Sequence, residues 1–140
     1  MPKKTARLGL LAAAATGLIL AAAPAASATT LPIGTGSGAC PSNFICLWSD
    51  YDFVAGSPSG KYAALASDQN IADMGKLKNE GGSWTGMQDI ASSVVNNTGS
   101  SICFYEHNGY GGAEFRIGPW EKWRTVPGWI NDRISSFKYC

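Results

Sequence analysis

The chain of 140 residues carries 11 basic residues, 10 acidic residues, one histidine and four cysteines. The first 28 residues hold three of the basic residues and none of the acidic ones, so the remainder has eight basic and ten acidic residues, a formal net charge of −2. A slightly acidic chain lacks the basic surface that binds phosphate backbones, which argues against nucleic acid as a partner.

The N-terminal residues have the pattern of a secretory signal peptide. Lys3, Lys4 and Arg7 precede an apolar run over residues 8–23, and residues 26–28 (ASA) have the small-x-small form of a cleavage site. The run is shorter than the roughly 20 residues of a membrane-spanning helix. We therefore expect cleavage after Ala28 and secretion of a product that does not bind a membrane. The remaining chain is long enough for one domain, and we expect it to be a monomer.

All four cysteines follow the expected cleavage site, at Cys40, Cys46, Cys103 and Cys140. An even number of cysteines in a small secreted chain predicts two disulfides, although spacing alone leaves all three pairings open. A zinc site is disfavoured because the chain has no CxxC pair and His107 is its single histidine.

The remaining sequence favours an all-β domain over residues 40–140. Residues 29–39 are rich in Gly, Ser, Thr and Pro and predict a flexible N-terminal arm. We expect one short helix at most, over residues 63–74 and ending before Gly75. Short runs rich in Val, Ile and aromatic residues predict strands, with the spacing of a sandwich, over residues 44–48, 92–95, 101–105, 113–117 and 134–139.

An internal repeat divides this domain into two halves. Residues 45–48 (ICLW) match residues 102–105 (ICFY) at an offset of 57, and the pattern Asp-x-x-Ser-Ser occurs at residues 89–93 and 132–136 at an offset of 43. The first half therefore holds 14 extra residues, which we expect in surface loops between Phe53 and Asp89.

Each half resembles the Greek-key unit of the βγ-crystallins, which opens with [YFW]-x4-[YF]-x-G and closes with [ND]-[ND]-x-x-[ST]-S. The second half carries the whole pattern, as Tyr105, Tyr110 and Gly112 followed by residues 131–136 (NDRISS). The first half departs from it, because Ala55 replaces the glycine and Gln88 replaces the first Asn or Asp. The resemblance implies a βγ-crystallin-like sandwich of two Greek-key motifs, with an aromatic ring packed over each hairpin and a positive φ at the glycine.

The closing motif is also the calcium motif of the βγ-crystallins. A hard cation such as Ca²⁺ prefers oxygen ligands. The better half-site would come from Asn131, Asp132 and Ser135, and the poorer one from Asp89 and Ser92. In many crystallins the serine only hydrogen-bonds the hairpin and no metal is bound, and we favour this structural role over a calcium site.

A closer resemblance is to the exported bacterial proteins grouped with the Streptomyces metalloproteinase inhibitor. Residues 40–48 (CPSNFICLW), followed by Tyr51, Phe53 and the Ser92-Ser93 pair, carry it. The resemblance covers about residues 40–139 and implies bridges Cys40–Cys46 and Cys103–Cys140. It also implies an extracellular peptidase as the partner.

Inhibition would require a rigid loop that enters a peptidase cleft with little loss of entropy. Two segments qualify, residues 57–84 and residues 120–129. The second holds Trp120, Trp123 and Trp129, a residue type favoured at binding hot spots. We nevertheless expect at least two of these tryptophans to fill the space between the sheets.

An enzyme is not expected. His107 lies in a turn that the fold explains, Asp50 and Asp52 flank a hairpin, and the chain has no HExxH, Walker or GxSxG motif. The leading hypothesis is a secreted peptidase inhibitor. The alternatives are a calcium-binding structural or stress protein of crystallin type and a killer-toxin-like or carbohydrate-binding module that uses the tryptophans.

Overall fold

The computed structural model describes residues 30–54, 64–77 and 86–140. The predicted signal peptide, Ala55 and the ends of the 57–84 segment lie outside these described residues. Within them, no helix has the length and apolar character needed to span a membrane.

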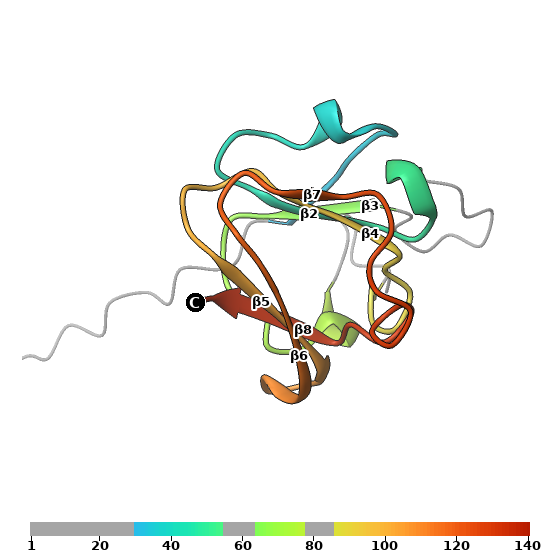
Figure 1. The fold of residues 1–140 in the computed structure, drawn as a ribbon, viewed down its shortest axis with the longest axis vertical. Helices are drawn as coiled ribbons and strands as arrows, with labels where there is room; N and C mark the ends of the chain where they lie inside the picture. The colour runs from blue at the N-terminus through green and yellow to red at the C-terminus, as the bar shows by residue number, and fades with distance from the viewer. Residues whose placement is uncertain (1–29, 55–63, 78–85) are drawn as a thin grey trace, which may run out of the picture.

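Two antiparallel sheets pack face to face (Figure 1). Sheet A has the strand order β1 (Thr30–Pro32), β3 (Ala64–Ser67), β2 (Ile45–Trp48), β4 (Ser93–Asn96) and β7 (Lys122–Trp123). Sheet B has the order β6 (Gly111–Ile117), β5 (Ile102–His107) and β8 (Ser136–Tyr139). The described part of the chain holds no α-helix, only the short 3-10 turns η1 (Ser37–Ala39), η2 (Tyr51–Phe53) and η3 (Met74–Lys76). The all-β prediction is confirmed.

Each half of the repeat contributes one segment to the sheet of the other half. β7, from the second half, pairs with β4 in sheet A. Ile71, from the first half, forms a bridge with Phe137 of β8, each N–H donating to the other residue's carbonyl at 2.9 Å. This exchange is the connection expected of two interlocked Greek keys.

The main core lies between the sheets. Inward-facing residues alternate along the strands, as Ile45 and Leu47 do in β2, and both are fully buried. Phe104 of β5 lies at the centre, with ring centroids 6.1 Å from Phe115 and 5.6 Å from Phe137.

A second apolar cluster covers the outer face of sheet A. Trp48 is fully buried there, and its indole N–H donates to the carbonyl of Gly34 at 2.9 Å. Leu31 and Ile33 of the predicted flexible arm pack against this cluster, and β1 pairs with β3. The described part of the N-terminal arm therefore packs against the domain, because it buries apolar surface on the outer face of sheet A.

The short helix that the sequence allowed over residues 63–74 does not form in the described part of that range. Ala64–Ser67 forms the buried strand β3, which lies between β1 and β2. A strand paired on both edges and buried on both faces selects small side chains, and here the alanines favoured the helical interpretation. β3 is the counterpart of β6 in the second half, so this part of the predicted insertion belongs to the sheet.

Candidate functional site

A buried serine closes the hairpin in each half. The Ser93 hydroxyl donates to the Asp50 carbonyl at 2.7 Å and accepts from the Phe53 N–H at 3.1 Å. The Ser136 hydroxyl makes the same pair of bonds, to the His107 carbonyl at 2.6 Å and from the Tyr110 N–H at 3.1 Å. The two Ser-Ser strands thus occupy equivalent places, as the repeat predicted.

Ser136→Ala is expected to lower the free energy of unfolding by about 1–3 kcal/mol, because it leaves a donor and an acceptor in the hairpin without their partner. Urea unfolding followed by fluorescence measures this change. Ser42→Ala, at an exposed position, serves as the control and should stay within about 0.5 kcal/mol of wild type. Equal stability of Ser136→Ala and the control would contradict the role assigned to the hydroxyl.

The aromatic hairpins take the expected form. Trp48 and Phe53 meet edge to face with centroids 5.4 Å apart, and Tyr105 and Tyr110 do so at 5.9 Å. Gly112 has φ +78°, and a Cβ there would lie 2.9 Å from Cδ2 of His107. A side chain at this position would therefore be both strained and crowded.

The predicted calcium ligands come together, but in a crossed arrangement. The Ser135 hydroxyl donates to Asp89 at 2.7 Å, and the Ser92 hydroxyl donates to Asp132 at 3.1 Å. The sequence grouped Asp132 with Ser135 and Asp89 with Ser92, whereas the hydrogen bonds join Asp132 to Ser92 and Asp89 to Ser135, and the calcium site stays a prediction. Each motif supplies its aspartate to the serine of the other motif, a pairing set by the packing of the halves.

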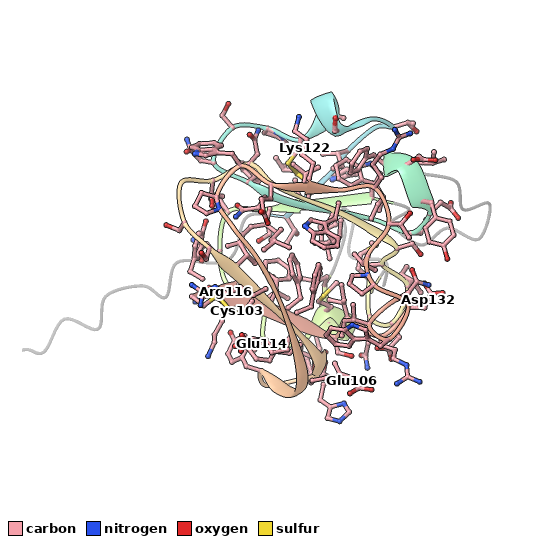
Figure 2. The ribbon with its side chains drawn as sticks, in the orientation of Figure 1. Cys103, Glu106, Glu114, Arg116, Lys122 and Asp132 are labelled. Atoms are coloured by element: carbon pink, nitrogen blue, oxygen red, sulfur yellow. A yellow bond between two sulfur atoms is a disulfide. The ribbon has the colours of Figure 1, made fainter. Side chains whose placement is uncertain are left out.

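The side chains at this site offer oxygen atoms, the donors that a hard cation prefers. Both aspartates have positive φ, +58° at Asp89 and +53° at Asp132. Oδ1 of Asn131 is buried and has no hydrogen-bond partner among the described residues. At the equivalent position Gln88 donates its amide to Asp89 at 3.4 Å. No group of three or more His, Cys, Asp or Glu side chains that could hold a metal ion occurs in the described ranges. In Figure 2 Asp132 lies at the right-hand edge of the molecule.

Both disulfides have the pairing that the family resemblance implied. Cys103–Cys140 joins β5 to the residue after β8, and Cys40–Cys46 closes a short ring. The Asn97 side-chain amide donates to the carbonyls of Cys40 and Pro41, at 3.0 Å each, and fixes this ring against the domain.

The three tryptophans of the 120–129 segment are all exposed. The exposed fractions are 58% for Trp120, 37% for Trp123 and 50% for Trp129, so the expectation that at least two lie in the core is wrong. Other side chains of the second half, among them Ile117, Val126 and Ile130, already fill that part of the core.

The structure brings only two of these rings together. Trp123 and Trp129 meet the Phe115 ring edge to face, at centroid distances of 5.1 and 6.3 Å. Trp120 lies apart from them, beside Gly99.

The backbone around Trp120 lies in the 120–129 segment, which the sequence predicted as one of two candidate inhibitory loops. Residues 119–125 are exposed without interruption and include β7, the last strand of sheet A. We call them the edge segment. The Trp120 N–H donates to the Thr98 carbonyl at 3.2 Å, and the Asn96 N–H donates to the Glu121 carbonyl at 2.9 Å. Figure 2 shows Lys122 of this segment at the top, far from Cys103 and Arg116 of sheet B. The sequence did not predict that Lys122 and Trp123 form the edge strand β7. Pro119, the first residue of the segment, and Pro127, two residues after its last, are the signal that could have suggested a structured loop.

The residues considered for catalysis have structural partners. Asp52 forms an exposed ion pair with Arg124 at 2.6 Å, and its N–H donates to the Arg124 carbonyl at 2.9 Å. The His107 carbonyl accepts from Ser136, while its ring lies at the surface. These positions form no arrangement of nucleophile and base, and the expectation that the chain is not an enzyme stays a prediction.

Comparison with solved structures shows the fold. A structure described as "Evolution of the eye lens beta-gamma-crystallin domain fold" has a TM-score of 0.59 and 16% identity, covering 81% of this chain and 97% of that chain. A βγ-crystallin from Ciona intestinalis has a TM-score of 0.52 and 22% identity, covering 69% and 99%. No curated protein matches the chain.

A family comparison goes further than the fold. The model of peptidase inhibitor family I36 matches residues 35–117, more than half of the chain. The match includes the Cys40–Cys46 ring, the first Greek key and the opening hairpin of the second. The chain belongs to peptidase inhibitor family I36.

Proposed function

We propose that this protein inhibits an extracellular peptidase by presenting a rigid, exposed segment to the cleft of the enzyme. The family match over residues 35–117 carries this proposal. The two disulfides support an extracellular site of action, because such bonds persist in oxidising compartments.

Rigidity is the physical requirement for an inhibitor that must stay bound without being degraded. A segment held in one conformation loses little entropy on binding. The edge segment meets this requirement through its hydrogen bonds to β4 and to the loop after it. The Arg124–Asp52 ion pair holds its far end. The 57–84 segment, the other candidate, supplies β3 to the middle of sheet A in its described part.

The test is a panel of purified peptidases: thermolysin, subtilisin, chymotrypsin and papain. Each is assayed on a peptide substrate with the disulfide-bonded protein at micromolar concentration. We expect at least one enzyme to lose activity in a dose-dependent, saturable way, and the inhibitor to stay intact on a reducing gel. Full activity of all four enzymes would contradict the proposal, and cleavage of the protein at the enzyme's normal rate would identify it as a substrate.

A second candidate function is calcium binding, favoured by the crossed Asp–Ser pairs and the unpartnered oxygen of Asn131. Asp132, Ser92 and Asn131 would hold one ion, and Asp89 and Ser135 the other. Each cation would hold an aspartate of one motif and a serine of the other and so stabilise the contact between the halves.

Titration with Ca²⁺ by calorimetry is expected to show binding to wild type that Asp132→Ala weakens more than Asp89→Ala does. The reason is that Asn131 offers a free oxygen beside Asp132, whereas Gln88 already donates to Asp89. Wild-type protein should also unfold at a higher temperature with Ca²⁺ than with EDTA. The absence of both heat and thermal shift would assign the motif a purely structural role.

A further inference from the structure

We infer that Trp120 is the anchor of this inhibitor, a side chain that enters an apolar pocket of the target peptidase. This inference rests on the proposed function and names the part of the surface that performs it. It assigns to one residue a role that the fold itself does not require.

The backbone at Trp120 is in a conformation that suits glycine. The Glu121 N–H donates to the Gly118 carbonyl at 3.4 Å, which closes a four-residue turn with Pro119 second and Trp120 third. Trp120 has φ +62°. A positive φ at the third position of such a turn is a glycine or asparagine conformation, and a bulky residue there is strained. Tryptophan is therefore an unfavourable choice for the turn.

The fold accounts for comparable strain elsewhere but not at Trp120. Phe53 and Tyr110 share a positive φ because they occupy the same place in the two hairpins, and Asp89 and Asp132 do so in the closing motifs. Among the described residues of the first half, no tryptophan, tyrosine or phenylalanine outside the hairpin has such a φ. The residue is 58% exposed, so its side chain contributes little to the core to offset the strain. Strained residues concentrate at functional sites.

The turn is held rigidly from the side of the domain. The side-chain amide of the fully buried Asn96 donates to the Gly118 carbonyl at 2.7 Å, and its backbone N–H donates to the Glu121 carbonyl at 2.9 Å. The Glu121 carboxylate accepts from the Gly118 N–H at 2.7 Å. The ring of Trp120 thus projects from a preorganised support, the condition under which a large aromatic side chain binds with little entropic loss.

The surroundings of Trp120 fit a peptidase cleft. The edge segment continues from the turn into β7, and no described strand pairs with the outer side of β7. A strand edge can add to the extended-chain binding site of another protein through backbone hydrogen bonds. One exposed apolar ring followed by the two-residue strand β7, whose outer side no described strand pairs, matches a cleft with one apolar pocket and a short groove for extended backbone.

The test compares four proteins against whichever enzyme of the panel wild type inhibits. Trp120→Gly should raise the inhibition constant at least about 30-fold, as expected for removal of a hot-spot residue. Its unfolding temperature should equal or exceed that of wild type, because glycine relieves the strained φ. Trp120→Phe should retain most of the inhibition. Trp129→Ala removes a similarly exposed tryptophan outside the edge segment and should inhibit like wild type.

The outcomes separate this inference from the proposed function. Inhibition by wild type that Trp120→Gly leaves unchanged would overturn the inference and keep the function. Equal losses in Trp120→Gly and Trp129→Ala would also overturn it, because the whole aromatic face would then be responsible. A lower unfolding temperature of Trp120→Gly would show that the ring serves the fold. No inhibition by wild type would remove the function and the inference together.

Discussion

Replacement of Cys103 and Cys140 together by alanine is expected to lower the free energy of unfolding by about 4 kcal/mol. The Cys103–Cys140 bond spans 37 residues of sequence, and closing a loop of that length removes roughly this much entropy from the unfolded chain. The bond also joins β5 to the end of β8, so its loss should allow the C-terminal strand to separate more easily. Guanidinium unfolding under oxidising conditions measures the change.

The Cys40–Cys46 pair provides the matched control for this experiment. Its separation is only 6 residues, for which the same entropy argument gives about 2 kcal/mol. If removal of the short ring lowered the free energy of unfolding as much as removal of the long one, loop entropy in the unfolded chain could not be the cause of both losses. Such a result would point instead to packing of the two cysteines in the cluster on sheet A.

Trp48→Ala is expected to lower the free energy of unfolding by about 3–5 kcal/mol, the range for removal of a large buried aromatic side chain. Trp48 is fully buried, meets Phe53 edge to face, and donates to Gly34. The variant should also loosen the N-terminal residues, because the indole is one of their attachments to sheet A.

Two measurements check this result. Chemical denaturation gives the loss of stability, and Trp129→Ala, which removes a half-exposed ring, should lose clearly less. Hydrogen exchange at the Gly36 amide, bonded to the Phe53 carbonyl at 2.7 Å, should accelerate in Trp48→Ala. Unchanged exchange there would show that the arm is held independently of Trp48.

The sequence allowed the two Greek keys to be predicted because the fold requires particular residues at fixed spacings. Trp48 and Tyr105 pack over the hairpins, and Ser93 and Ser136 close them by hydrogen bonds that a residue without a hydroxyl would not make. Such local requirements repeat with the fold and can be recognised in one chain. The disulfide pairing followed from the family resemblance and not from spacing.

Features that depend on packing between distant segments could not be predicted. The alanines of β3 favour a helix locally, and only the strands on both sides make this segment a strand. The exposure of Trp123 depends on how completely Ile117, Val126 and Ile130 fill the core, a volume that composition does not give. The crossed pairing of Asp132 with Ser92 is likewise set by the docking of the halves.

The mutual exchange of β7 and the Ile71 bridge makes the two halves dependent on each other. Sheet A takes β7 from the second half and sheet B takes the Ile71 bridge from the first half, so the domain should unfold in a single cooperative transition. A peptidase that cut the linker between β4 and β5 would leave two fragments, of which the C-terminal one still holds β7 in sheet A and the N-terminal one still holds the Ile71 bridge to sheet B. Such a nicked molecule would keep its shape, a property well suited to a protein whose working surroundings contain the enzymes that degrade proteins.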